Sequence, residues 1–255
     1  MALSEMGSEQ ATATTKTMAD AIHFLDYLAT HPDATIRYHA SDMILNNHSD
    51  ASYLSASRGR SRAGGHFFLG WNPEKTKPIR LNGQILSLCE ILKFVSSSAA
   101  EAELGALFLN TKQARIIRLT LDELGHPQPP TPINCDNETA VGICNGTVKR
   151  QRSRSMEMRY FYVADQVDNK IVDVRWAPGA ENMGDYLTKH FLAPHHRRVR
   201  PLYTHTPQSP RELPRAMRPS DLRGCVGKYP GVYTRGRVLP NMGTSRVRSW
   251  VPRAA

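Results

Sequence analysis

Four acidic residues stand where secondary structure would direct them toward one point: Asp50, Glu103, Asp136 and Asp185. Asp50 lies in HSDAS, in or at the end of the first strand-like segment, and Glu103 lies in the first turns of a long helix. Asp136 ends a short apolar segment just before a helix, and Asp185 lies near the start of the last helix expected. Because strand ends and helix starts cluster along one edge of an α/β sheet, we expect the four carboxylates to gather there.

Carboxylates gathered in this way predict that hard divalent cations bind between them. The charges repel and raise one another's pKa, so such a group is stable only around cations. Oxygen ligands select Mg²⁺ or Mn²⁺, which keep several waters and also bind phosphate. Two such ions suit the in-line hydrolysis of a phosphodiester, since one activates water and the other stabilises the leaving oxygen.

Each acid also has a purely structural interpretation. Asp50 could cap a turn, Asp136 could be a helix N-cap, and Asp185 could be a favourable acid in a first helical turn. Glu103 could be a partly exposed helix charge. Each explanation is common when taken singly, but one acid on each appropriate element, in order, favours a shared site.

The stretch SSSAAEAELGAL, residues 96–107, contains two glutamates that must have different roles. Helix positions two apart point in nearly opposite directions. Ser98 and Glu101 fit a capping box, in which each side chain accepts a bond from the other's backbone N–H. Glu103 lies one turn before Leu107, on a face that should be buried, where a carboxylate needs a partner, a proton or a metal. We therefore assign Glu101 to the helix start and Glu103 to the site.

The elements around these acids predict an α/β domain with a mixed five-stranded sheet. Strands are expected at 42–53, 66–71, 84–95, in the segment before Asp136, and at 171–176, the second after a polar turn ASRGRSRAGG. Helices are expected at 98–125, from 137, at 156–167 and at 182–189. The order β-β-β-α-β-α-α-β-α joins the first three strands as a meander.

The two ends of the chain differ from the predicted α/β domain in charge, composition or periodicity. The net charge of the 255 residues is +10, but residues 195–255 hold 13 basic and 2 acidic residues, so the rest is close to neutral. Residues 201–255 are also rich in proline and arginine, which predicts a disordered tail whose charge attracts nucleic acid. Residues 1–17 lack periodicity and are expected to be a disordered leader, whereas residues 18–33 have helical spacing.

The spacing of the cysteines and the hydropathy limit the cellular compartments in which the protein is expected. The four cysteines show neither CxxC nor zinc-ligand spacing and indicate reduced intracellular thiols: Cys89, Cys135, Cys144 and Cys225. No apolar run is long enough to span a bilayer, and the N-terminus lacks a signal-peptide layout. By elimination we expect no membrane partner and a cytoplasmic or nuclear location.

Four stretches together resemble the RNase H domain of a copia-type LTR retrotransposon polyprotein: SSAAEAELGAL, INCDNETA, RSMEMRYFYVADQV and ENMGDYLTKHF. The resemblance covers about residues 34–200. It implies an RNase H-like fold that cuts the RNA strand of RNA–DNA hybrids during reverse transcription. It also implies two Mg²⁺ ions, with Mn²⁺ as a substitute, as cofactors. By the same resemblance, Asp50, Glu103, Asp136 and Asp185 are the catalytic, metal-binding residues.

The same resemblance suggests a second partner and a location. MADAIHFLDYLATHPD, residues 18–33, looks like the end of the reverse transcriptase thumb or connection region. The polymerase domain of the same polyprotein would then be a partner. If the element is intact, the location would be a cytoplasmic virus-like particle.

Departures from related proteins limit what the chain is expected to do. It lacks the Tyr-x-Asp-Asp turn of a polymerase, so we expect no DNA synthesis. The loop WAPGAEN has no histidine of the kind that aids product release in many cellular RNases H, which implies slow turnover. A non-catalytic, nucleic-acid-binding remnant stays open as an alternative. An integrase or transposase is disfavoured, because these use two aspartates and a later glutamate, with a Cys/His zinc region.

Candidate substrate contacts lie near the acids in the sequence. A hybrid is a rod of phosphates, so cations should flank the metals. The candidates are Lys149, Arg150, Arg152, Arg154 and Arg159, although a solvated charged loop fits the same pattern. Asn137, next to Asp136, could contact a 2′-hydroxyl in the shallow minor groove.

Overall fold

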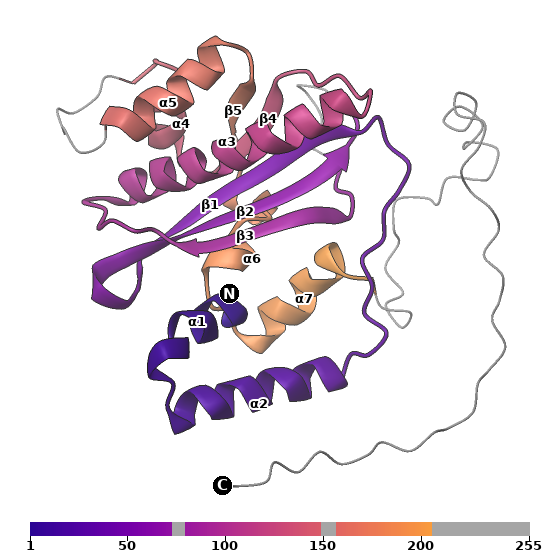
Figure 1. The fold of residues 1–255 in the computed structure, drawn as a ribbon, viewed down its shortest axis with the longest axis vertical. Helices are drawn as coiled ribbons and strands as arrows, with labels where there is room; N and C mark the ends of the chain where they lie inside the picture. Colours follow the sequence, from indigo (N-terminus) through magenta and orange to yellow (C-terminus); the bar gives the residue numbers. More distant parts are fainter. Residues whose placement is uncertain (73–79, 149–156, 206–255) are drawn as a thin grey trace, which may run out of the picture. The chain divides into compact units, whose positions relative to one another are not determined.

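The fold is built on one mixed five-stranded sheet. The computed structural model describes residues 1–72, 80–148 and 157–205. The strand order is β3-β2-β1-β4-β5, with β1, β2 and β3 antiparallel and with β4 and β5 parallel to β1 (Figure 1). The expected mixed sheet and its opening meander are therefore confirmed.

The sheet strands follow the chain order expected from the sequence. Their bounds are Ile44–Ala56 for β1, Arg60–Gly70 for β2, Gln84–Ile91 for β3, Thr131–Cys135 for β4 and Val172–Trp176 for β5. Short 3₁₀ helices lie at Gln10–Thr12, Ser57–Gly59 and Gly179–Glu181.

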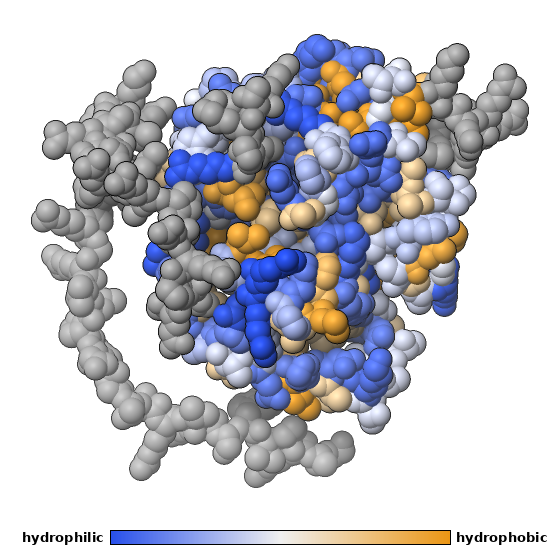
Figure 2. Space-filling model, turned by 180° about the vertical axis from the view of Figure 1, so that it is seen from behind, coloured by the Kyte–Doolittle hydropathy of each residue, from blue (hydrophilic) through white to orange (hydrophobic). Residues whose placement is uncertain are grey.

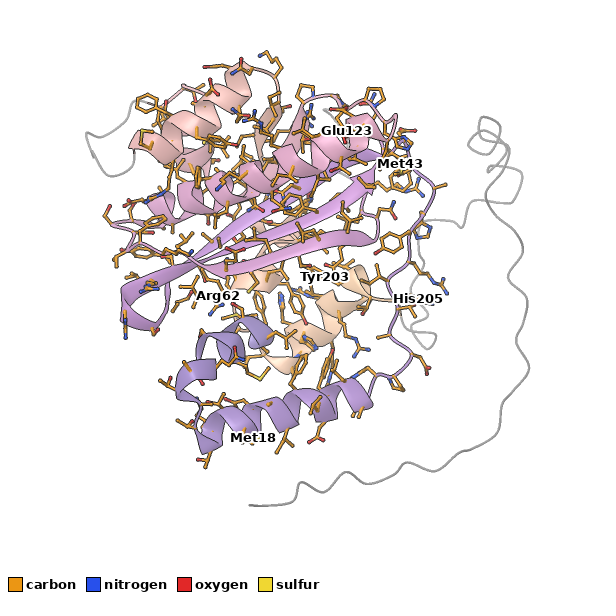
Figure 3. All side chains as sticks on the ribbon, in the orientation of Figure 1. Met18, Met43, Arg62, Glu123, Tyr203 and His205 are labelled. Carbon is orange, nitrogen blue, oxygen red and sulfur yellow. The ribbon has the colours of Figure 1, made fainter. Side chains whose placement is uncertain are left out.

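Helices cover both faces of the sheet (Figure 1). One face packs against α3 (Ala99–Glu123), α4 (Glu138–Cys144) and α5 (Glu157–Asp168). The other face is covered by α6 (Asp185–Thr188) and α7 (Ala193–Tyr203), with α1 (Ala2–Ser8) and α2 (Thr15–Ala29) nearby. Figure 3 shows Arg62, a residue of β2, and Tyr203, the last residue of α7, on the side of the sheet that faces α1 and α7.

Because β1 is covered on both faces, its polar residues are buried as well as its apolar ones. Residues Ile44 to Ser52 are all buried. Buried polar groups need hydrogen-bond partners, and Asn110 of α3 supplies several. The Asn110 amide nitrogen lies 3.0 Å from Ser49 Oγ and 2.9 Å from the Gly64 carbonyl oxygen, and Asn110 Oδ1 accepts a bond from Asn47. This contact fixes α3, and with it Glu103, against β1.

Arg118 ties the end of α3 to the start of β4. Its buried guanidinium donates to the carbonyl oxygens of Gln128 and Pro129 and to Thr131 Oγ1. Arg118→Met would leave these acceptors unpaired, so we expect a loss of about 2–4 kcal/mol in the free energy of unfolding. Urea unfolding measures this, with Arg115→Met, an exposed position on the same helix, as the matched control. Equal unfolding midpoints for the two variants would contradict the assignment.

The N-terminal leader differs from the expectation of disorder in residues 1–17. The structure has α1 at Ala2–Ser8, and α2 begins at Thr15 with a Thr14–Thr17 capping box. Glu5 of α1 contacts the buried Arg62 at 3.7 Å and His190 at 2.9 Å. The helix is therefore held by polar side chains far away in the sequence, which a local periodicity cannot reveal.

Strand β2 is longer than expected, because part of the predicted turn is strand. The turn is confined to Ser57–Gly59, and β2 starts at Arg60. Gly64 and Gly65, which suggested a turn, lie inside β2 where other elements approach closely. A Cβ on Gly65 would lie 1.9 Å from Asn110 Oδ1. Glycine in a strand interior often marks such an approach.

Helix α7 crosses the expected boundary at residue 200, since it runs from Ala193 to Tyr203. Helix α2 likewise crosses the expected boundary between residues 17 and 18, and the other domain boundaries stay predictions. Of the predicted tail at residues 201–255, the part from residue 206 onward lies outside the described residues. Hydrophobic side chains on the face shown in Figure 2 form small groups separated by hydrophilic ones. Among the helices described, none has both the length and the apolar character that crossing a bilayer requires.

Candidate metal centre

The four predicted acids come from four different elements that meet at one place. Asp50 lies within β1 opposite Gly64, and Glu103 lies near the start of α3. Asp136 directly follows β4, and Asp185 is the first residue of α6. The carboxylates influence one another, since Asp136 and Asp185 raise the pKa of Asp50 while Asp50 and Asp136 raise that of Glu103.

For Asp50, Asp136 and Glu103, the structure excludes the purely structural interpretation that the sequence left open. Asp50 lies in a strand rather than a turn, and its side chain is 0% exposed. The N-cap of α4 is Asn137, whose Oδ1 accepts a bond from Ala140, rather than Asp136. Glu103 is buried instead of partly exposed. Asp185 does lie in a first helical turn, so its favourable interaction with that helix is compatible with a site role.

The two glutamates of α3 have the different surroundings that were expected. Ser98 Oγ accepts a bond from the Glu101 backbone N–H at 3.2 Å, which forms half of the predicted capping box. The other half is corrected, because the Glu101 carboxylate accepts from the backbone N–H and hydroxyl of Ser97 instead of from Ser98. Glu101 therefore holds the loop before α3, and the carboxylate stays out of the acidic cluster.

Glu103 is held in place by backbone and thiol donors. Its Oε1 accepts a bond from the Ala51 N–H at 3.1 Å, and the Cys135 thiol lies 3.7 Å from Oε2. Burial, followed by the charges of Asp50 and Asp136, raises the Glu103 pKa well above its ordinary value. Burial, followed by the charge of Glu103, also raises the Cys135 pKa well above its ordinary value, and in the metal-free protein the thiol donates to Glu103. Ligand atoms of Glu103, Cys135 and Asp136 all lie within 4.8 Å of one another.

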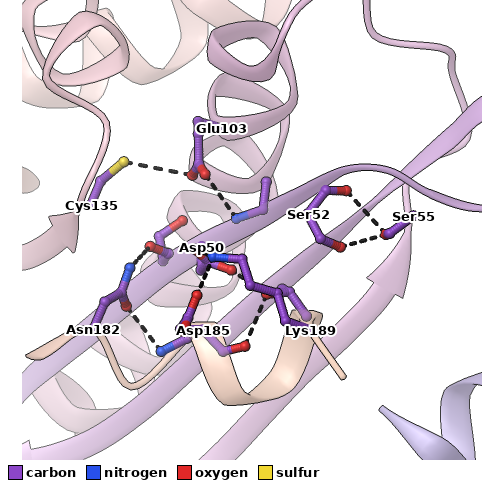
Figure 4. A network of polar contacts seen from close by, with 12 residues as sticks. Asp50, Ser52, Ser55, Glu103, Cys135, Asn182, Asp185 and Lys189 are labelled. Carbon is purple, nitrogen blue, oxygen red and sulfur yellow. Dashed lines mark hydrogen bonds and ion pairs between the residues drawn. The ribbon is translucent and has the colours of Figure 1, made fainter. Parts of the chain in front are cut away.

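The two oxygens of Asp50 have different surroundings. The Thr188 hydroxyl donates to Oδ2, whereas Oδ1 is buried without a hydrogen-bond partner. The Lys189 ammonium lies 3.5 Å from Oδ1 and pairs with Asp185 (Figure 4). Burial raises the pKa of Asp50 to about 6, although Lys189 and Thr188 oppose the shift. The protein's own cations therefore compensate this carboxylate only in part.

The loop before α6 is fastened directly to β1. The Asn182 amide donates to the Ser49 carbonyl oxygen at 2.9 Å, and its Oδ1 accepts from the Gly184 N–H (Figure 4). A Cβ on Gly184 would lie 2.9 Å from the Asp50 Cβ, so glycine lets the loop pass close to the acid. This attachment places Asp185 beside Asp50.

Asp136 is positioned by the loop that follows β5. The indole N–H of the half-exposed Trp176 donates to the Asp136 carbonyl oxygen at 3.1 Å. A Cβ on Gly179 would lie 2.9 Å from Asp136 Oδ2. The WAPGAEN segment, which lacks the histidine of cellular enzymes, therefore contacts Asp136 through a tryptophan and a glycine.

Five residues that support the acids were not predicted from the sequence: Cys135, Trp176, Asn182, Thr188 and Lys189. A signal existed for two of them, because Thr188 and Lys189 lie three and four residues after Asp185. That spacing puts all three on one side of a helix.

The predicted substrate contacts are only partly described by the structure. The Arg159 guanidinium lies over the Phe94 ring, 3.5 Å from its centroid, in a cation–π contact. Asn137 caps α4 with its side-chain oxygen. The remaining basic candidates lie outside the described residues: Lys149, Arg150, Arg152 and Arg154.

The cluster has the composition of a site for a hard divalent cation. Carboxylate oxygens predominate, Cys135 adds one sulfur, and Asp50 Oδ1 is buried without a hydrogen bond. An oxygen-rich set of this kind suits Mg²⁺ or Mn²⁺. Asp50, Glu103, Asp136 and Asp185 are the residues that can hold such an ion.

The sheet order, the helix order and the acidic cluster define an RNase H-like fold with a possible metal site. No family model matches the chain. The chain is 26% identical over 165 residues to the retrovirus-related Pol polyprotein from transposon TNT 1-94 of Nicotiana tabacum. The match covers 65% of this chain and 12% of that polyprotein. The similarity to a retrotransposon polyprotein is thus confirmed.

Solved structures with a similar fold include RNases H at low sequence identity. LC11-RNase H1 in complex with an RNA/DNA hybrid is 14% identical with a TM-score of 0.41, covering 56% of this chain and 93% of that one. The RNase H domain of PFV is 14% identical with a TM-score of 0.38, covering 57% and 90% respectively.

Proposed function

We propose that this chain is the RNase H domain of a copia-type retrotransposon polyprotein, which hydrolyses the RNA strand of RNA–DNA hybrids during reverse transcription. The observation that carries the proposal is the convergence of Asp50, Glu103, Asp136 and Asp185 from four elements on one cluster, in which Asp50 and Glu103 are buried and the other two are partly exposed. The similarity to the tobacco Pol polyprotein supports the retrotransposon origin.

In this mechanism the four acids would hold two Mg²⁺ ions, or Mn²⁺ in their place. Such ions, when bound, would supply an activated water and charge stabilisation for the leaving oxygen of the phosphodiester. The chain itself contributes orientation. The Ala51 N–H fixes Glu103, the Thr188 hydroxyl fixes Asp50, and the Trp176 indole fixes the backbone at Asp136. Ligands held by a second layer of contacts are preorganised for the transition state.

The same proposal assigns the contacts with the hybrid. Lys149, Arg150, Arg152, Arg154 and Arg159 would bind phosphates, and Asn137 would contact the minor groove beside Asp136. For Arg159 this requires the guanidinium to leave the Phe94 ring or to use its outer edge.

The polymerase domain of the same polyprotein is the proposed protein partner. Helix α2 presents a row of exposed apolar side chains at helical spacing: Met18, Ile22, Leu25 and Leu28. Such a row is typical of a helix that packs against another domain. We place the reaction in the cytoplasm, in a virus-like particle if the element is intact, or in the nucleus.

The proposal is tested with the purified chain, a hybrid labelled on its RNA strand, and Mg²⁺. We expect the wild-type chain to cut the RNA strand and Asp136→Asn to cut it at least about 100-fold more slowly, because removing even an outer contact of a metal ligand costs 10–100-fold. Asp173→Asn is the matched control, since this aspartate pairs with Arg175 away from the cluster. Hybrid binding without cleavage, in Mn²⁺ as well as Mg²⁺, would instead identify a non-catalytic remnant.

A further inference from the structure

Lys189 lies between two of the acids of the proposed metal centre (Figure 4). Its ammonium pairs with Asp185 Oδ1 and lies 3.5 Å from Asp50 Oδ1. The Lys189 side chain is 40% exposed, whereas that of Asp50 is 0% exposed. The cation therefore reaches the buried acid from the solvent side.

This ammonium compensates a carboxylate that has few other partners. Thr188 occupies Asp50 Oδ2, and Oδ1 has no hydrogen bond. A buried charge without a counter-charge is strongly unfavourable. The Lys189 ammonium, which pairs with Asp185 and lies 3.5 Å from Asp50 Oδ1, supplies this counter-charge.

A divalent cation and the Lys189 ammonium would need the same oxygens. Asp50 Oδ1 is the oxygen of this carboxylate that lacks a hydrogen bond, and the ammonium lies 3.5 Å from it, so an ion held by Asp50 and Asp185 would lie close to the Lys189 charge. Two positive charges this close repel each other strongly in a partly buried site. The exposed lysine stem leaves the ammonium a path back to solvent.

We infer that Lys189 is a built-in counter-cation, which neutralises Asp50 and Asp185 in the metal-free protein and must withdraw before a divalent cation binds between them. Lys189 therefore lowers the affinity of the centre for Mg²⁺ and stabilises the fold when the metal is scarce. It is a positioning residue that acts through the two acids. The inference rests on the proposed metal centre.

The test is a calorimetric titration of the full chain with Mg²⁺ alone, without nucleic acid. We expect Lys189→Met to bind Mg²⁺ about tenfold more tightly than wild type, a typical size for the coupling between two competing ligands. In EDTA the same variant should melt at a lower temperature than wild type. Lys189→Arg keeps the charge and should stay close to wild type in both measurements.

Equal or weaker Mg²⁺ binding by Lys189→Met would overturn the inference. If this variant fails to fold, Lys189→Gln, which keeps a polar head, is titrated in its place against the same criterion. Because no hybrid is present, the result is independent of cleavage. Tighter binding by a chain that never cuts RNA would uphold the role of Lys189 and remove the proposed nuclease function.

Discussion

Glu103→Gln is expected to stop RNA cleavage and, at the same time, to raise the melting temperature of the metal-free protein. The rate should fall by more than about 100-fold, since a proposed metal ligand is lost. Stability should rise because Glu103 is buried beside Asp50 and Asp136, and glutamine removes the charge while it can still accept the Ala51 N–H bond. Cleavage assays and scanning calorimetry in EDTA measure the two effects.

The pH dependence of the stability effect follows from the direction of the pKa shift. The Glu103 pKa lies well above its ordinary value of 4.5, so the folded state binds this proton more tightly than the unfolded state does. The resulting stabilisation is present below pH 4.5 and is lost as the pH rises toward the folded pKa. Glu103→Gln should therefore gain most over wild type near neutral pH and little near pH 4.5. In the wild type, burial raises the pKa of Asp50 to about 6, which adds a loss of stability between about pH 4 and 6.

The matched control for this variant lies two residues earlier on the same helix. Glu101→Gln weakens the bonds that the carboxylate accepts from Ser97 and leaves the acidic cluster intact. It should retain cleavage and melt at a slightly lower temperature. If Glu103→Gln were less stable than wild type in EDTA near neutral pH, repulsion within the cluster would be the wrong explanation.

Gly64→Ala is expected to destabilise the domain by about 1–3 kcal/mol and to slow cleavage, since overpacking a tight contact forces the backbone to move. A Cβ at this position would lie 2.6 Å from Thr188 Cγ2 and 2.9 Å from the Gly184 carbonyl oxygen. To relieve these contacts, α6 must move away from β2, and Thr188 must move with it. The hydroxyl that holds Asp50 would then be displaced.

Urea unfolding and the cleavage rate of Gly64→Ala should be measured beside Gly7→Ala. A Cβ on Gly7, in α1, would have no neighbouring atom within 4 Å, so this variant should lose neither stability nor activity. A Gly64→Ala protein with wild-type unfolding and cleavage would show that α6 does not depend on close contact with β2.

The sequence was sufficient to predict the sheet and the order of its strands, and the four acids that it singled out lie on elements that meet in the structure. Apolar runs and helical spacing are local properties, and each acid lies next to a recognisable element boundary or inside a regular segment. The helix face predicted that Glu103 is buried, but Glu101 is buried as well, so the two glutamates differ in their hydrogen-bond partners rather than in their burial.

The features that could not be predicted depend on contacts between elements that are distant in the sequence. Gly64 and Gly65 indicate a turn by local rules, but they are needed because Thr188 and Asn110 pack against them. Helix α1 is held by the contact of Glu5 with Arg62, which no local pattern contains. Lys189 is an ordinary helix-end lysine in the sequence, and its pairing with Asp50 is apparent only once α6 lies against β1.

The place of α6 at the end of the domain has a consequence for how the protein is made. During synthesis the chain leaves the ribosome N-terminus first, so β1 and α3 are available early. Asn47 of β1 must still wait for its parallel partner Ile133, and Asp50 must wait for Thr188 and Lys189. The centre is therefore completed by almost the last segment of the domain to emerge. A nascent or truncated chain that lacks α6 should be unable to cut RNA, however well its sheet has formed.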